Sequence, residues 1–323
     1  MHARWFGIVA VLFAAFTSPA ARAAEPNWPE SLTIVTASPG GTYYAYGEGL
    51  AKILIRVLGM PVSMRPTEGP SQNIQLIEAG EAQLGFVTMG VTLQAWNGTG
   101  DWTGGRQYRS IRALFPMYDT PFHFVVLNNS PIRSIASVSG KRVGVGPQGG
   151  TAGAFVPRML AALNIAASPA FGSWADLAAE LQAQSVDVLG AAVGAPFPAV
   201  AELDAKKAVR FVPLSPNEVL SLRLAIPELT PSLIPAGTYP SLMRNYETVG
   251  LYNFAVAHQD LPTDLAYRIV DAVFSNHQQM IEVHPAAAAT VPENFVHNTF
   301  LPYHSGAARY FGNLVAADAA RGD

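Results

Sequence analysis

The sequence contains no cysteine, and only 13% of its 323 residues are charged. Without cysteine the chain cannot form disulfides, thiol nucleophiles, iron–sulfur clusters or cysteine-ligated zinc sites. The 20 basic residues are scattered and face 23 acidic ones, for a formal charge of −3, so the clustered cations of a nucleic-acid-binding surface are missing. Half of the residues are hydrophobic, which is enough to build packed cores, and the length suits two domains at roughly 150 residues each.

Sequence motifs of catalysis and nucleotide binding are also missing. There is no H-E-x-x-H zinc motif, no G-x-S-x-G nucleophile elbow, and no lysine in a glycine-rich turn of the P-loop kind. The dinucleotide fingerprint G-x-G-x-x-G is matched at 144–149, but its first glycine falls inside a predicted strand, and no acidic residue ends a second strand about 20 positions later. The four histidines nearest the C-terminus are spread far apart. We therefore expect no catalytic residue, no metal site and no cofactor, and we expect that the protein is not an enzyme.

The first 23 residues have the layout of a secretory signal peptide. Arg4 supplies a positive charge, Trp5–Phe16 is an apolar run, and Ala21–Ala23 forms an A-x-A cleavage pattern. The run is shorter than the ~20 residues that a helix needs to span a bilayer. A buried N-terminal helix or an uncleaved anchor is the alternative. We expect cleavage near Ala23, export to a bacterial periplasm, and no membrane-spanning segment in the mature chain.

Downstream of this segment, predicted strands and helices alternate. Runs of β-branched and apolar residues indicate strands, whereas apolar residues that recur every three or four positions, such as Leu50, Ile53 and Leu54, indicate helices. Such alternation favours parallel sheets covered by crossover helices. Two α/β units follow one another, and a long amphipathic helix stopped by Pro285 comes later. The predicted strands are 32–37, 62–65, 84–87, 122–127, 142–145, 186–193, 209–214 and 248–257, and the predicted helices are 46–58, 71–79, 154–163, 174–184, 199–203, 262–284 and 306–317.

Two glycine-rich turns, one in each unit, lie between a predicted strand and a predicted helix. They are Ser38–Tyr44 and Gly146–Thr151. In an open parallel sheet, ligands bind beyond the carboxyl ends of the strands, where helix N-termini offer unpaired backbone N–H groups and a partial positive charge. Glycine lets a ligand approach the backbone, and Thr42 and Thr151 add hydroxyl groups. The pattern predicts an anion such as a carboxylate or a phosphate; two ordinary tight turns capped by threonine are the alternative.

Six segments carry a further pattern: Gly40–Tyr44, Ala79–Val87, Trp96–Gly100, Ser134–Gly146, Gly194–Leu203 and Ile234–Pro240. Together they resemble the TAXI family, the periplasmic solute-binding proteins of TRAP transporters. Each motif is short, and the resemblance rests on their common order along the chain. The matching segments extend over most of the sequence that follows the predicted signal peptide.

The resemblance implies the α/β architecture of a type II periplasmic binding protein, with two α/β lobes joined by two hinge strands. On this basis the hinge strands are expected at 121–126 and 249–256. Lobe one would consist of residues 24–120 together with 257–323, and lobe two of residues 127–248. The two glycine-rich turns would then face each other across a cleft, one from each lobe.

The resemblance also implies a function. It predicts capture of a small organic anion, a carboxylate or an acidic amino acid, in the cleft, and delivery to the membrane subunits of a TRAP-type permease that an ion gradient drives. Ten residues are expected at the ligand. They are Gly41, Thr42, Tyr43, Ser71 and Thr88 from lobe one, Gln148, Gly150 and Thr151 from lobe two, and Phe197 and Tyr239 as walls of the cleft.

Three positions bear on the kind of ligand. Pro70 stands where the family often has serine, which removes one N–H donor, and Ser71 follows as a substitute. Gly90 stands where an aspartate is common, which favours a plain carboxylate over an amino acid. Arg65 ends a predicted strand and fits either a bidentate contact to a carboxylate or an ion pair on the surface.

Two other functions fit the same fold. One is a periplasmic sensing subunit that passes ligand occupancy to a signalling partner. The other is an enzyme on this fold, which would need a nucleophile or a cofactor anchor.

Overall fold

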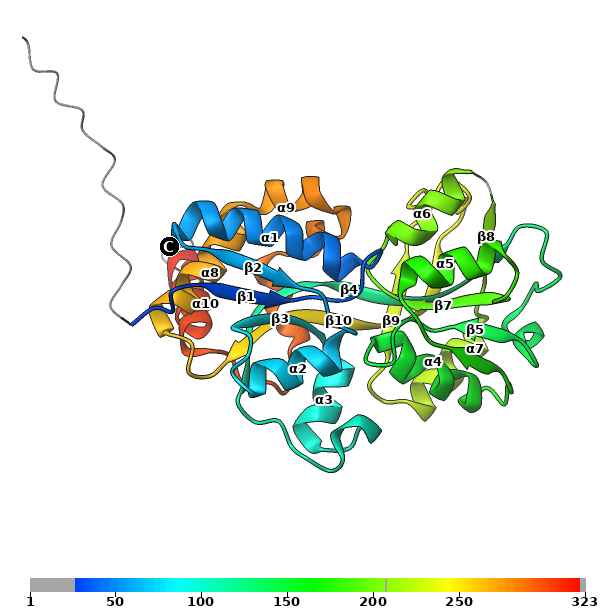
Figure 1. Ribbon diagram of the computed structural model, residues 1–323, viewed down its shortest axis with the longest axis horizontal. Helices are drawn as coiled ribbons and strands as arrows, with labels where there is room; N and C mark the ends of the chain where they lie inside the picture. The colour runs from blue at the N-terminus through cyan, green and yellow to red at the C-terminus, as the bar shows by residue number, and fades with distance from the viewer. Residues whose placement is uncertain (1–26, 207, 320–323) are drawn as a thin grey trace, which may run out of the picture.

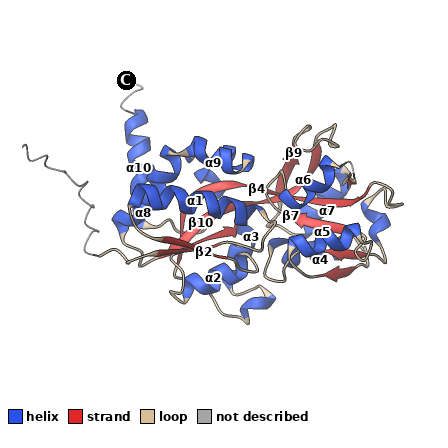
Figure 2. Cartoon of the chain, turned by 45° about the horizontal axis from the view of Figure 1, so that its top comes forward, coloured by secondary structure: helices blue, strands red, loops and turns tan. Residues whose placement is uncertain are grey.

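The computed structural model describes residues 27–206 and 208–319, and the predicted signal peptide lies outside these residues. Two α/β lobes lie side by side along the long axis of the molecule (Figure 1). Their strands hydrogen-bond in the order β2-β1-β3-β10-β4-β7-β5-β6, with β8 on β4 and β9 on β10. Helices cover both faces of the strands (Figure 2). The predicted α/β architecture with two lobes is therefore confirmed.

Lobe one contains the first glycine-rich turn. Its parallel strands are β1 (Leu32–Val35), β2 (Val62–Arg65) and β3 (Leu84–Thr88). An apolar stripe on the first helix packs on this sheet, and Gly59 ends that helix with a left-handed φ of 68°. The helices are α1 (Thr42–Leu58), α2 (Pro70–Glu78), α3 (Met89–Asn97), α8 (Thr263–Ser275), α9 (His277–Val283) and α10 (Ser305–Ala319), with 3₁₀ turns η1 (Asp101–Thr103), η3 (Pro285–Ala289) and η4 (Pro292–His297).

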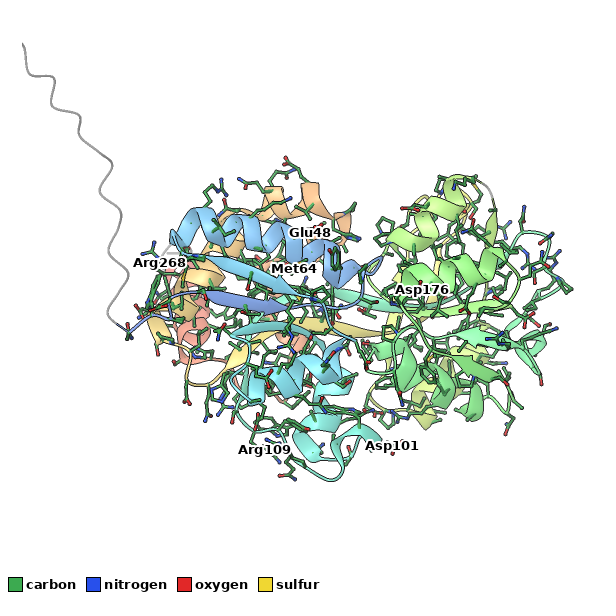
Figure 3. The ribbon with its side chains drawn as sticks, viewed as in Figure 1. Glu48, Met64, Asp101, Arg109, Asp176 and Arg268 are labelled. Atoms are coloured by element: carbon green, nitrogen blue, oxygen red, sulfur yellow. The ribbon has the colours of Figure 1, made fainter. Side chains whose placement is uncertain are left out.

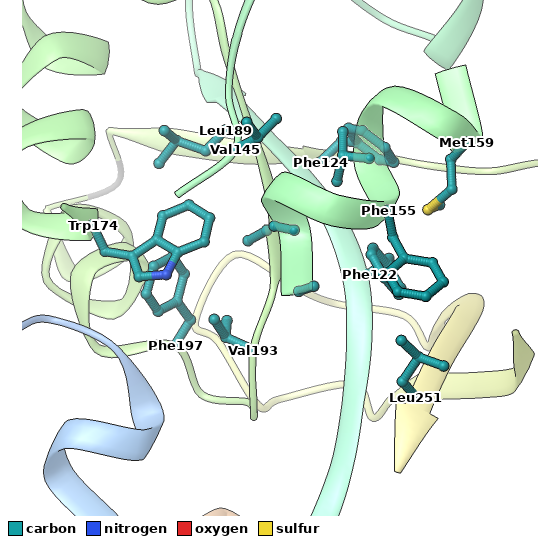
Figure 4. Close-up of a cluster of buried hydrophobic side chains, with 14 of the residues drawn as sticks. Phe122, Phe124, Val145, Phe155, Met159, Trp174, Leu189, Val193, Phe197 and Leu251 are labelled. Carbon is teal, nitrogen blue, oxygen red and sulfur yellow. The ribbon is translucent and has the colours of Figure 1, made fainter. Parts of the chain in front are cut away.

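Lobe two contains the second glycine-rich turn. Strands β5 (Arg142–Gly144), β6 (Ser168–Ala170) and β7 (Val188–Ala192) are parallel. Its core is rich in aromatic side chains, among them Phe122, Phe155 and Phe197, which are fully buried (Figure 4). The other elements are β8 (Val209–Val212), β9 (Thr230–Ile234), α4 (Thr151–Ala162), α5 (Trp174–Gln182), α6 (Pro198–Ala205), α7 (Pro216–Ala225) and the 3₁₀ turn η2 (Ile135–Val138).

Two long strands belong to both lobes. β4 (Ile111–Leu127) pairs with β10 (Tyr246–His258) through its first part, and residues 122–127 pair with β7 and β8 of lobe two. The start of β10 pairs in turn with β9, and its later part pairs with β3 of lobe one. The chain therefore enters and leaves lobe two through adjacent, hydrogen-bonded strands. The residue limits expected for the lobes and the hinge strands stay a prediction.

Several elements differ from the predictions, and β6, β9, α3 and α7 have no predicted counterpart. The first part of β4 was not expected because Pro116 and Pro121 disfavour a strand between two neighbours; register shifts opposite Tyr252 and Phe254 accommodate the irregularity. The helix expected at 262–284 is divided into α8 and α9. Asn276 interrupts it, since its side-chain Nδ2 donates to the Ala272 carbonyl (2.7 Å). Helix α3 was not predicted. It follows β3 directly, and no glycine or proline precedes it to indicate where a helix begins.

Candidate functional site

The two glycine-rich turns meet at one cavity between the lobes. Gly41 and Thr42 of the first turn line it, and so do Gly150 and Thr151 of the second. The cavity volume is about 40 Å³. A cavity needs roughly 10–15 Å³ for each water molecule, so the closed lobes leave room for a small solute and not for a polymer.

Five helices begin at the cavity. Its lining includes the first residue or the N-cap of α1, α2, α3, α4 and α5. In α1 to α4 no side chain caps the first turn, so the orphan N–H groups of these helices have no side-chain acceptor. Each N-terminus carries a partial positive charge of roughly half a unit. The cavity is therefore rich in hydrogen-bond donors that converge from both lobes.

No Lys or Arg is found among the described residues that line the cavity. Among the described residues that form it, Glu68 is the one charged side chain, and it is exposed. Other charged groups, such as Asp101, Arg109 and Asp176, lie on the outer surface of the lobes (Figure 3). An anion in the cavity would therefore be stabilised by backbone N–H groups and helix dipoles and not by an ion pair.

Buried hydroxyl groups tie the lobes together around the cavity. The Oγ1 atoms of Thr88 and Thr151 are 3.0 Å apart, one from each lobe. Thr42 Oγ1 donates to the Gly194 carbonyl at 2.8 Å, and Ser71 Oγ donates to the Gly149 carbonyl at 2.8 Å. The lobes are therefore closed. The hydroxyl groups that were expected to contact a ligand form hydrogen bonds across the cleft instead.

Tyr43 connects the cavity to both crossing strands. Its hydroxyl donates to Asn253 Oδ1 at 2.6 Å, and Asn253 Nδ2 donates to the Tyr118 carbonyl and to Thr120 Oγ1, each at 2.6 Å. Burial raises the pKa of Tyr43 well above its usual value, so the phenol stays protonated and remains a donor. A ligand that moves Tyr43 therefore acts on residues of β4 and β10.

Six of the ten predicted residues line the cavity, and the other four do not. Ser71 lies at the contact between the lobes, while Gln148 is exposed and lines a separate cavity of about 700 Å³. Phe197 and Tyr239 are fully buried in lobe two, where the Phe197 N–H donates to Tyr239 Oη (2.6 Å). The six lining residues are Gly41, Thr42, Tyr43, Thr88, Gly150 and Thr151.

The wall expected of Phe197 is provided by Trp174 instead. The Trp174 ring packs edge-on against Phe197, with 5.0 Å between ring centroids, and lines the cavity (Figure 4). A Cβ placed on Gly41 would lie 3.4 Å from this ring, so Trp174 contacts the opposite turn. In the sequence, Trp174 is recognisable only as the start of the predicted helix 174–184. Ser173, which accepts from the Asp176 N–H and caps α5, marks the helix start but not the contact of Trp174 with the cavity.

Ser38 is a second residue of the cavity that the sequence marks only as part of a turn. It lines the cavity and is 8% exposed, and its Oγ has no hydrogen-bond partner among the described residues. A buried hydroxyl group without a hydrogen-bond partner destabilises the fold unless a ligand or a water molecule forms the missing hydrogen bond. Arg65, by contrast, forms an exposed ion pair with Glu81 (3.3 Å) and does not line the cavity.

Two other features are absent from the part of the chain that the structure describes, a cluster of metal-ligating side chains and a membrane-spanning helix. No three or more His, Asp or Glu side chains group there to hold a metal ion. None of the helices between residues 27 and 319, residue 207 aside, is long and apolar enough to cross a bilayer.

The sequence matches a known protein family, and the fold is similar to that of several solved structures. The profile of a family described as NMT1-like matches residues 34–313. A solved structure entitled "Structure of a periplasmic transporter" matches with a TM-score of 0.58 and 13% identity over 92% of this chain and 98% of that one. The alkanesulfonate-binding protein SsuA from Xanthomonas axonopodis pv. citri, bound to MOPS, matches with a TM-score of 0.51 and 17% identity over 88% and 84%. An ancestral arginine-binding protein bound to arginine matches with a TM-score of 0.52 and 14% identity over 80% and 97%. These likenesses confirm the predicted two-lobed fold of periplasmic binding proteins.

Proposed function

This chain belongs to the NMT1-like family, and from that premise we propose that it is a periplasmic solute-binding protein, not an enzyme, which captures a small organic anion in its cleft. The anion is a carboxylate or an acidic amino acid, with the plain carboxylate favoured. Closure of the lobes around it presents the loaded protein to a membrane permease.

One observation carries this proposal. Helix N-termini from both lobes converge on a single cavity whose described lining has no Lys or Arg. Because hydrogen-bond donors outnumber acceptors there, the cavity favours a ligand with negatively charged acceptor atoms, such as a carboxylate. The alkanesulfonate-binding protein with a similar fold is a binder of another small organic anion. Ligand contacts are assigned to Ser38, Trp174 and the six lining residues named above.

Closure follows from the position of these donors on two lobes. A ligand that meets donors of both lobes binds the closed form more tightly than the open form, and so shifts the population towards closure. The hydroxyl contacts of Thr42, Thr88 and Ser71 across the cleft add to the closed form without ligand. Closure is therefore expected to be favourable once a small anion offsets the cost of ordering the lobes.

Delivery to a TRAP-type permease rests on the TAXI resemblance of the sequence. That resemblance supports grouping the chain with binding proteins that serve ion-gradient-driven membrane subunits. A permease gene beside the gene for this chain supports delivery, whereas a neighbouring sensor kinase gene favours the sensing alternative.

A thermal-shift screen of the purified protein with small carboxylates, acidic amino acids and neutral amides tests the anion class. Ligand that binds the native state alone stabilises it by about 2.7 kcal/mol at a hundredfold excess over Kd. We expect one or more carboxylates to raise the melting temperature and their amides to leave it unchanged. Stabilisation by the amides and not by the acids would refute an anion site.

Replacing Thr151 by valine removes a hydroxyl at the start of α4 while keeping the shape of the side chain. A hydrogen bond to a charged group contributes about 1.5–3 kcal/mol, so the affinity for the anion from the screen is expected to fall about tenfold to a hundredfold. Isothermal titration calorimetry measures this change. Thr33→Val, on β1 away from the cavity, is the matched control, and equal affinities for both variants would remove Thr151 from the site.

A further inference from the structure

A second cavity lies on the opposite face of the crossing strands from the anion cavity. Neighbouring residues of a strand point to opposite faces, and Thr120 of β4 lines the anion cavity while Asp119 lines the other one. We call the second cavity the back pocket; its volume is about 580 Å³. Its lining includes Leu93, Asp119, Glu228, Leu251, Tyr252, His297 and Thr299.

Asp119 forms the acidic floor of the back pocket. It pairs with Tyr252 across the two crossing strands, and its Oδ2 accepts a hydrogen bond from the Ser232 hydroxyl of β9. Gly250 makes room for it, since a Cβ there would lie 2.8 Å from Asp119 Oδ1. Burial raises the pKa of Asp119 to about 6, so the carboxylate is still mostly ionised at neutral pH.

No cation offsets the charge of Asp119 within the described chain. The ion pairs found there involve other acids, and Glu228, the second acid of the pocket, already pairs with Arg158 at 3.2 Å. His297 is the one histidine that lines the pocket, and burial lowers its pKa, so it is neutral at neutral pH. The site thus holds one uncompensated negative charge in partly apolar surroundings, which an incoming cation would stabilise.

Aromatic rings form one wall of the pocket. The His297 ring stacks on Tyr252 with 4.1 Å between centroids and an interplanar angle of 11°. Leu93 and Leu251 supply apolar surface beside them. A ring face next to a carboxylate is a favourable place for an ammonium group, because the quadrupole of the ring and the acid attract the same charge.

We infer that the back pocket is a second small-molecule site, which takes an organic amine with an aromatic or aliphatic body. The ammonium group would bond Asp119 and lie near the Tyr252 ring, and the body would pack on Leu93 and Leu251. The volume falls in the range of roughly 300–1,000 Å³ that is usual for small-molecule pockets. The charge preference is the reverse of that of the anion cavity, so the two sites select different solutes.

Calorimetric titration of the full chain with 2-phenylethylamine at neutral pH tests this inference. We expect the amine to bind, and its neutral analogue 2-phenylethanol and its acidic analogue 3-phenylpropanoate to bind more weakly or not at all at this pocket. Asp119→Asn keeps the shape of the floor and is expected to weaken amine binding by about tenfold to a hundredfold, the usual range for a lost charged hydrogen bond. Thr299→Trp fills the exposed mouth and is expected to block binding while leaving Asp119 in place.

Two controls locate the site. Glu247→Gln removes an exposed acid outside the pocket from β10, the strand that carries Tyr252. Thr151→Val alters the anion cavity, and both variants are expected to keep the amine affinity of the unmodified chain. Lack of amine binding at millimolar concentration would overturn the inference. Equal binding by Asp119→Asn, or a loss in Thr151→Val alone, would overturn it as well, because the amine would then sit elsewhere.

Discussion

Replacing Gly149 by valine is expected to hold the lobes apart and to weaken anion binding roughly tenfold to a hundredfold. The nearest atoms to a Cβ at this position all belong to lobe one: Ser71 Oγ at 2.9 Å, Glu68 Cβ at 3.0 Å and Glu68 Oε2 at 3.4 Å. An overpacked contact of this kind costs about 1–3 kcal/mol, and here the cost falls on the closed form alone. Small-angle scattering should give a larger radius of gyration for the variant, with or without ligand.

A matched control separates closure from folding. Gly172 also lies in lobe two, but a Cβ there meets only Leu177 at 3.6 Å, which is ordinary contact. Gly172→Val is therefore expected to scatter and to bind like the unmodified chain. Unchanged binding by Gly149→Val would contradict a site that requires the lobes to close as they do here.

Acid is expected to act on stability through two buried groups with opposite sign. Burial among Phe197, Phe211 and Tyr239 lowers the pKa of His123 from 6.5 to about 4. Between these pH values His123 is protonated in the unfolded chain and neutral in the folded chain. The free energy of unfolding therefore decreases as the pH falls from about 6.5 to about 4. The loss is about 3 kcal/mol at roughly 1.4 kcal/mol per unit.

Protonation of Asp119 has the opposite effect on the free energy of unfolding. Burial raises its pKa from 3.8 to about 6, so the folded chain takes up the proton first and gains stability as the pH falls from about 6 to about 4. The gain is smaller, about 2 kcal/mol, because the carboxylate keeps contact with solvent through the back pocket. The two effects largely offset each other in the unmodified chain.

Single substitutions should expose each effect. The difference in free energy of unfolding between His123→Gln and the unmodified chain is expected to shift by about 3 kcal/mol in favour of the variant between pH 7 and pH 4. Asp119→Asn is expected to shift by about 2 kcal/mol in the opposite sense. Urea titrations at several pH values measure both. Burial also lowers the pKa of His284, His297 and His304, but their effect cancels in each difference. A pH-independent difference for His123→Gln would refute the buried neutral histidine.

Local sequence signals predicted much of the fold. The period of Leu50, Ile53 and Leu54 predicted a helix at 46–58, and α1 extends over Thr42–Leu58. Helix α7 escaped notice although Ser215 and Glu218 form a capping box, because only Leu222 of that helix is buried and no apolar period results. Elements that depend on long-range pairing, such as the first part of β4, are not encoded in local pattern and could not be found in this way.

The candidate site was predictable where backbone geometry decides it. A glycine turn between a strand and a helix is a local pattern, and both turns reach the cavity. The cavity wall was not predictable, since Trp174 comes from α5 and meets Gly41 only when the lobes come together. For the same reason, no local pattern reveals that Thr88 and Thr151 bond to each other.

The entry and exit of lobe two through β4 and β10 determine the order in which the two halves are completed during synthesis. Lobe two is a continuous insertion, so all of its strands and helices are available once the start of β10, which pairs with β9, has been made. Lobe one must wait for β10, α8 and α10, because these cover its sheet and come last. Lobe two can therefore be complete before lobe one, whose sheet still lacks α8 and α10 at that stage.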